Sequence, residues 1–191
     1  PNNDLPGVML AGAGRTDLNQ FGVAVGKRVV VAVNNDTAYR AALDLLVAGV
    51  EVAAVADMRS SCDGVSADAL RDHGVPVYAG AAVSGALGGK RVRAVKVTGL
   101  NAHQRRETTI ACDAVLTSGG WTPSVHLYSQ AAGKLKWRDD IGAFVPEDTV
   151  DDFHCAGACR GVFSFSDCID DGARAAFRAL HALGMAPAAY P

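Results

Sequence analysis

The sequence contains no long apolar run and no excess of one charge. No stretch approaches the roughly 20 apolar residues of a membrane-spanning helix, so we expect no transmembrane segment and no membrane partner. Eighteen Lys and Arg residues stand against 20 Asp and Glu residues, which gives a net charge of −2. No block of like charge is present. This balance argues against a nucleic-acid-binding protein and against a charged tail.

The chain also lacks an initiator methionine, a signal peptide and a transit peptide at its start. We therefore expect a piece of a longer chain. The five cysteines form no disulfide framework by their spacing, and a reducing cytoplasm is the simplest location. With 191 residues, 49% of them hydrophobic, the chain can form one large domain or one domain plus part of another.

A β-α-β unit is predicted after residue 26. The β-branched run 28–33 indicates a strand, 38–47 favours a helix capped by 34–37, and 51–57 indicates a second strand. We expect residues 1–26 to be irregular, because no long helical pattern follows Gly12-x-Gly14.

The rest of the sequence predicts alternating strands and short helices. Val, Arg and Lys alternate over 91–97, a pattern typical of an antiparallel ribbon. A buried strand at 113–116 ends at Gly119-Gly120, where glycine permits a sharp turn at the ligand-binding edge of a sheet. Further predicted elements are a helix at 63–73, a strand at 75–78, a short strand at 108–110, a helix at 124–132, a hairpin over 133–146, a strand that leads into a small-residue turn over 153–158, and a helix at 166–183.

A dinucleotide would be expected at the first strand-to-helix turn of such a fold, but this turn lacks the necessary glycines. The expected pattern is Gly-x-Gly-x-x-Gly, and residues 34–39 read Asn-Asn-Asp-Thr-Ala-Tyr. Asp36 would place a negative charge where pyrophosphate normally binds. We therefore predict that this site has lost its nucleotide and that Asp57, which ends the second strand, is a structural residue.

No catalytic group stands out, and no metal site is predicted. His154, Cys155, Cys159 and Cys168 lie close together in the sequence, but their spacing fits no structural zinc pattern well. Buried thiols that behave as small apolar groups are the better interpretation.

Several motifs resemble the α subunits of heterotetrameric sarcosine oxidases. They are Ser118-Gly-Gly-Trp-Thr-Pro-Ser-Val-His126, the segments 6–12, 34–39, 129–130, 133–137 and 143–146, and Ala156-Gly-Ala-Cys159. The similarity covers essentially the whole chain, and α subunits of other amine and amino-acid oxidases share parts of it.

The resemblance implies an α/β, Rossmann-like three-layer domain with an antiparallel ribbon, within a flavoprotein architecture of two dinucleotide-binding domains. On this basis, residues 1–21 and 123–149 would be connecting segments. Residues 22–122 would form an inserted NAD(P)-binding-like domain, and 150–191 would be the returning strand and helix of the first dinucleotide-binding domain. The glycine-rich unit that holds NAD in the family would lie upstream, and the folate-binding domain downstream.

The same resemblance implies the cofactors and partners. NAD would be held in the α subunit mostly by residues outside this piece, FAD and FMN by the β subunit or its interface, and tetrahydrofolate in the full complex. The partners would be the β subunit and the smaller subunits of the heterotetramer, and the piece alone could self-associate. In related flavoproteins a Gly-Asp turn binds the ribityl chain; here it is Gly157-Ala158, which matches NAD. Gly157, Ala158 and Cys159 are the candidate lining residues.

The first functional prediction is therefore part of an enzyme that oxidatively demethylates sarcosine to glycine, with formaldehyde or methylene-tetrahydrofolate and hydrogen peroxide. This piece would be a scaffold and a wall of the nucleotide domain, without catalytic residues. The alternatives are an NAD(P)H-dependent flavoprotein reductase and a non-catalytic interaction module. We also expect exposed apolar side chains in residues 1–25 and 123–191.

Overall fold

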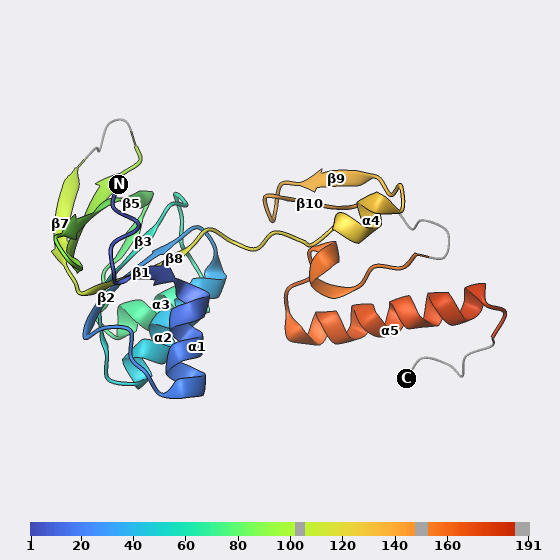
Figure 1. Cartoon of the computed structure of the whole chain (residues 1–191), viewed down its shortest axis with the longest axis horizontal. Helices are drawn as coiled ribbons and strands as arrows, with labels where there is room; N and C mark the ends of the chain where they lie inside the picture. Colours follow the sequence, from blue (N-terminus) through green and yellow to red (C-terminus); the bar gives the residue numbers. More distant parts are fainter. Residues whose placement is uncertain (102–105, 148–152, 186–191) are drawn as a thin grey trace. The chain divides into compact units, whose positions relative to one another are not determined.

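The chain folds into two units, and each is described by itself. The computed structural model describes residues 1–101, 106–147 and 153–185 (Figure 1). Unit 1 comprises Pro1–Gly120 and unit 2 comprises Trp121–Pro191.

Unit 1 is built on a five-stranded parallel sheet with the order β1-β8-β2-β3-β4. Its central strands are short and rich in Val and Ala, as is typical of a sheet that is buried on both faces. The strands are β1 (Val8–Leu10), β2 (Arg28–Val33), β3 (Glu51–Asp57), β4 (Val77–Ala79) and β8 (Ala114–Ser118). The predicted strands at 28–33 and 51–57 are confirmed.

Helices cover one face of this sheet and a second sheet covers the other (Figure 1). The helices are α1 (Ala11–Phe21), α2 (Tyr39–Val47), which follows the 3-10 turn η1 (Asp36–Ala38), and α3 (Val65–Asp72). The second sheet is antiparallel and consists of β5 (Ala81–Gly88), β6 (Val92–Gly99) and β7 (Glu107–Ala111). A hydrophobic core lies on each face of the parallel sheet. Val29 and Val31 of β2 pack in the core beneath the helices, and Val30 packs in the core against β5–β7. The predicted three-layer α/β fold with an antiparallel ribbon is confirmed.

The expectation that residues 1–26 are irregular is wrong. They contain β1, which pairs with β8, and α1, which packs on the helix-covered face of the sheet. A side chain at Gly14 would come within 2.8 Å of Leu116 on β8, so glycine here lets the helix approach the sheet. Glycine lowers helix propensity, and the tertiary contact outweighs that preference.

Unit 2 contains a hairpin and a long helix. The hairpin joins β9 (Leu135–Arg138) to β10 (Ala143–Pro146), as predicted. The other elements are the helix α4 (His126–Gln130), the 3-10 turn η2 (Gly157–Arg160) and the helix α5 (Phe165–Ala182). The strand predicted from Phe153 is reduced to a bridge at Phe153, and the predicted small-residue turn follows as η2 from Gly157.

Apolar side chains are exposed in both segments where we expected them. In the first segment these are Leu10, Phe21 and Val23; in the second they include Leu127, Trp137, Phe144, Phe165, Ile169 and Leu183. Within the described part of the chain, no helix has the length and apolar character needed to cross a membrane.

Candidate functional site

The carboxyl ends of β2, β3 and β8 meet at one edge of the parallel sheet. Val33, the last residue of β2, pairs with Asp57 of β3 on one side and with Ser118 of β8 on the other. Open α/β sheets bind ligands outside this edge, so the side chains that gather here form the first candidate site.

Asp57 is fully buried, and both of its carboxylate oxygens are hydrogen-bonded. Tyr39 Oη donates to Oδ2 over 2.7 Å, and the Arg59 backbone N–H donates to Oδ1 over 2.9 Å. The Arg59 guanidinium also donates to the carboxylate, with Nη2 at 2.7 Å from Oδ2. The prediction that Asp57 is structural agrees with this arrangement, since neither oxygen is left for a ribose hydroxyl.

The protonation of this cluster follows from its contacts. Burial opposes the ionisation of Asp57, but the hydrogen bonds from Arg59 and Tyr39 outweigh burial and hold the pKa of Asp57 below its usual value. Burial and the bond to Asp57 raise the pKa of Tyr39 well above its usual value. At neutral pH the cluster therefore consists of a carboxylate, a guanidinium and a neutral phenol.

Arg59 links this buried cluster to the turn that would hold a phosphate. Its Nη2 also lies 2.7 Å from Oδ1 of Asp36, the first residue of η1. Asn35 caps the same turn, because its Oδ1 accepts the backbone N–H of Thr37 over 3.0 Å. A carboxylate and a capping amide thus occupy the positions from which backbone N–H groups would contact pyrophosphate.

The turn after β8 contacts the turn that begins at Asn34. Asn34 Nδ2 donates to the Gly119 carbonyl oxygen over 3.0 Å, and Asn35 Nδ2 donates to Asn34 Oδ1 over 2.7 Å. Gly120 has φ of +93°, the backbone conformation that the Gly-Gly pair was predicted to supply. The residues at 34–39 therefore do not fit a dinucleotide phosphate. Sequence reasoning identified Asp36 but missed Arg59, whose place two residues after Asp57 is the only signal.

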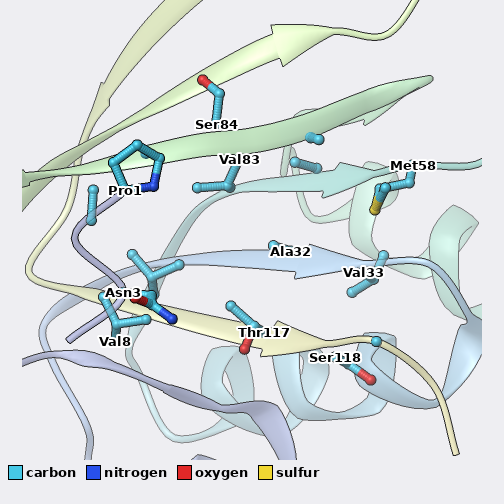
Figure 2. A pocket seen from close by; sticks show the side chains of 16 residues that line it. Pro1, Asn3, Val8, Ala32, Val33, Met58, Val83, Ser84, Thr117 and Ser118 are labelled. Atoms are coloured by element: carbon cyan, nitrogen blue, oxygen red, sulfur yellow. The ribbon is translucent and has the colours of Figure 1, made fainter. Parts of the chain in front are cut away.

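A cavity of about 280 Å³ opens at the same edge, on the face of the sheet opposite the helices (Figure 2). Its two walls are the parallel sheet and β5. It is lined by Pro1, Asn3, Val8, Ala32, Val33, Ala56, Met58, Ala82, Val83, Ser84, Gly85, Ala86, Val115, Thr117, Ser118 and Gly119. No acidic or basic side chain of the described residues lines it, and no pattern in the sequence predicted it.

In unit 2, the three predicted lining residues belong to the turn η2. The Gly157 N–H donates to Oδ2 of Asp171 over 2.9 Å, and Asp171 of α5 is only 7% exposed. Arg160 Nη1 donates to the other oxygen of Asp171 over 2.5 Å. The Cys159 thiol donates to the Ala156 carbonyl oxygen over 3.0 Å. Of the three candidates, Ala158 is exposed and Gly157 has no amide free for a ligand.

The N-terminus of α5 is also occupied. Ser164 is its N-cap and accepts the backbone N–H of Asp167 over 3.2 Å. Asp167 adds a carboxylate to the first turn, where the helix dipole stabilises it. A phosphate that approached this end of the helix would meet the carboxylate of Asp167.

His154 and Cys155 line a second cavity, of about 360 Å³, in unit 2, together with Pro146, Glu147, Phe153, Arg160 and Arg178. Both ring nitrogens of His154 are buried and have no hydrogen-bond partner among the described residues. Burial and the neighbouring Cys159 thiol raise the pKa of Cys155. Among residues 1–101, 106–147 and 153–185, no group of three His, Cys, Asp or Glu side chains is placed to hold a metal ion.

The chain is similar to known sarcosine oxidase subunits and to solved structures of a dehydrogenase and of a reductase. It is 39% identical over 176 residues to the sarcosine oxidase subunit alpha of Corynebacterium sp. strain U-96, covering 90% of this chain and 18% of that protein. The identity to the subunit of Rhizobium meliloti strain 1021 is 35% over 187 residues, covering 96% of this chain and 18% of that protein. No protein-family model matches the chain.

Solved structures share the fold at low sequence identity. L-proline dehydrogenase from P. horikoshii has a TM-score of 0.62 at 21% identity, covering 98% of this chain and 32% of that one. Thioredoxin reductase from T. acidophilum has a TM-score of 0.59 at 19% identity, covering 81% of this chain and 52% of that one.

The chain spans about a fifth of the length of the curated relatives it matches. Over that span its sequence is similar to the sarcosine oxidase alpha subunits.

Proposed function

We propose that the chain is the part of a heterotetrameric sarcosine oxidase α subunit that supports the nucleotide domain without performing the oxidation. The assembled enzyme would convert sarcosine to glycine, with hydrogen peroxide and with formaldehyde or methylene-tetrahydrofolate as the other products. It would be an oxidoreductase acting on a CH–NH bond with oxygen. The β subunit and the smaller subunits would be its partners in the cytoplasm.

The observation that carries the scaffold role is the closed turn at Asn35 and Asp36. Its capping bond and its ion pair to Arg59 use the groups that would otherwise contact a phosphate. A pyrophosphate would have to displace the side chain of Asp36 and leave Arg59 with only the buried Asp57 as its partner. Unit 1 would therefore keep the fold of a nucleotide-binding domain without free groups to bind the phosphate.

The proposed cofactors would likewise be bound mainly outside this chain. NAD would be bound in the α subunit mainly by residues outside this chain, with Ala158 and its neighbours Gly157 and Cys159 at the wall of that site. In this role Ala158 offers only apolar contact, and Asp171 fixes the turn that presents it. FAD and FMN would be associated with the β subunit or its interface, and tetrahydrofolate with the full complex.

A chimeric enzyme tests the proposal. The aligned 188 residues of the α subunit from Corynebacterium sp. strain P-1 are replaced by this chain, and the tetramer is assembled with its own partners. We expect sarcosine-dependent oxygen uptake with equimolar hydrogen peroxide, and a flavin content equal to that of the parent. A chimera that assembles with full flavin content but does not oxidise sarcosine would contradict the assignment.

Calorimetry on the 191-residue chain separates this proposal from the reductase alternative. We expect no saturable heat with NADH or NADPH, because residues 34–39 leave no phosphate site. Micromolar binding of either nucleotide would reject the scaffold role and favour a reductase. If the chain is instead a non-catalytic interaction module that does not join this assembly, the chimera would fail to retain the flavin-bearing partner.

A further inference from the structure

We propose that Cys155 and Cys159 form a dithiol that a hydroperoxide oxidises to an intramolecular disulfide. The pair lies in unit 2, where Cys159 belongs to the turn η2 and Cys155 precedes that turn. Their placement alone supports this inference, which does not depend on the function proposed above. The oxidase proposed there would release hydrogen peroxide, which is an oxidant of this class.

The two thiols lie within hydrogen-bonding range of each other. Gly157, between them, has φ of +68°, a left-handed conformation that allows the chain to turn sharply. After this turn, Cys159 Sγ lies 3.0 Å from the carbonyl oxygen of Ala156, the residue that follows Cys155. The backbone therefore folds the second cysteine back toward the first.

Hydrogen bonds to the helix α5 hold this turn in place. The buried Asp171 accepts the Gly157 N–H at Oδ2 over 2.9 Å and Nη1 of Arg160 at Oδ1 over 2.5 Å. Gly157 lies between the two cysteines and Arg160 follows the second one, so the turn is fixed on both sides of Cys159. Groups that a fold holds together in this way react as if they were at a high local concentration.

Exposure separates this pair from the cysteines of the hydrophobic cores. Cys62 and Cys112 are only 3% and 4% exposed, and each lies in a core of unit 1. Cys155 and Cys159 are partly exposed, and Cys155 also lines the cavity of about 360 Å³. Hydrogen peroxide is little larger than water, which occupies about 30 Å³, so it can enter this cavity. A small oxidant thus has access to the pair and not to the core thiols.

Cys168, near the start of α5, is the other partly exposed thiol of unit 2. It lies close to the same turn, because a Cβ added at Gly157 would be 3.6 Å from its Sγ. Its thiol donates to the Val162 carbonyl oxygen over 3.1 Å, on the chain that leaves the turn. A disulfide between Cys159 and Cys168 is therefore the competing product that the experiment must distinguish.

The oxidation consumes one hydroperoxide for each disulfide. The sulfur of one thiol attacks an oxygen of hydrogen peroxide, the O–O bond breaks, and a sulfenic acid and one water form. The sulfur of the other thiol then attacks the sulfenic sulfur, and the S–S bond forms as a second water leaves. The two thiols lose two electrons and two protons, and the peroxide is reduced to two waters.

Proximity, and not a stabilised thiolate, is what favours this reaction. Burial and the neighbouring Cys159 thiol raise the pKa of Cys155, so Cys155 remains a thiol at neutral pH. The disulfide would close a ring of only five residues, and such a short ring removes little conformational entropy from the unfolded chain. A thiol reductant should therefore reopen it, which makes the modification reversible.

Peptide mass mapping tests the pairing, because trypsin separates the cysteines. Residues 139–160 form one tryptic peptide with Cys155 and Cys159 as its only cysteines, and Cys168 lies in the peptide 161–174. After hydrogen peroxide treatment of the folded 191-residue chain, we expect the first peptide to be lighter by two hydrogen atoms. Dithiothreitol should restore its mass. Added oxygen without loss of hydrogen, or a cross-link between the two peptides, would overturn the proposal.

The contribution of the fold is tested by the rate of oxidation. The disulfide should form about tenfold faster or more in the folded chain than in concentrated urea, because the turn holds the thiols together only when the chain is folded. Equal rates in the two conditions would show that the structure does not prepare this pair.

Two serine variants complete the test. Cys159→Ser should abolish the loss of hydrogen and leave Cys155 to take up oxygen instead. Cys168→Ser is the matched control and should form the disulfide as the parent does. Failure of a folded Cys168→Ser variant to form it would contradict the assigned pairing. The mass of the parent peptide carries the test by itself if either variant does not fold.

Discussion

The guanidinium of Arg59 holds the fully buried carboxylate of Asp57 and, through the same Nη2, the carboxylate of Asp36 at the exposed turn. Both Nη2 contacts are 2.7 Å long. One arginine therefore joins the end of β3 to the turn η1, which follows β2 and leads into α2. This bridge stands where a dinucleotide-binding fold normally holds a phosphate.

Replacing Asp57 with Asn should destabilise the chain by roughly 2–3 kcal/mol. The substitution removes charge-assisted hydrogen bonds, while Arg59 stays partly exposed and keeps Asp36, so no buried charge is left without a partner. Urea unfolding followed by circular dichroism measures the change. Asp4→Asn, at an exposed position, is the control and should be within about 0.5 kcal/mol of the parent. A neutral effect of Asp57→Asn would contradict the role of the bridge.

Stability should fall as the solution is acidified, and part of that fall should depend on Asp57. The pKa of Asp57 is lowered in the folded state, so its contribution is present above the ordinary value of 3.8 and is lost as the pH drops through the folded value. The unfolding free energies of the parent and Asp57→Asn should therefore differ by a constant amount from neutral pH down to about pH 4 and converge as the pH falls further. Asp44 and Asp113 also have lowered pKa values and should produce acid sensitivity in both proteins. Parallel pH profiles would rule out the Asp57 contribution.

Two glycines of α1 should respond to alanine in opposite directions. A Cβ at Gly14 would lie 2.8 Å from Leu116 Cδ2, in a packed core, and overpacking costs roughly 1–3 kcal/mol. A Cβ at Gly12 meets nothing within 4 Å, so alanine there should stabilise the helix by about 0.5–1 kcal/mol. Paired unfolding curves give the comparison. A Gly14→Ala variant at least as stable as Gly12→Ala would show that the contact is not tight.

In unit 2, Asp171→Asn should loosen the turn η2. The change removes the charged partner of Arg160 and weakens the acceptor of the Gly157 amide, at a cost of roughly 2 kcal/mol. Hydrogen exchange of the Gly157 amide measures this locally and should become about tenfold faster or more. Asp167→Asn, in the exposed first turn of the same helix, is the control and should leave that exchange rate unchanged. Unaltered exchange in Asp171→Asn would mean that the bond does not hold the turn.

Much of the fold could be predicted because its signals are local. The β-branched run at 28–33 and the capping residues at 34–37 specify strand and turn through short-range preferences. The alternation at 91–97 likewise indicated an antiparallel ribbon, which the structure has as β6 between β5 and β7. The loss of the phosphate site was also visible, because Asp36 stands in place of a glycine.

Contacts between distant residues decided the rest. β1 and α1 were not predicted because they depend on contacts with the distant strand β8. This strand pairs with Val8–Leu10 and packs closely against Gly14. Arg59 and Asp36 are 23 positions apart, and Gly157 and Asp171 are 14 positions apart. No local sequence pattern predicts the ion pair of the first two or the hydrogen bond of the second two. The sequence by itself determined several strands of the sheets, the resemblance to sarcosine oxidase alpha subunits and the missing phosphate turn, since these follow from residue type and spacing. Only the tertiary structure decided which groups are already bonded and where a cavity remains, because both depend on the packing of one sheet against another.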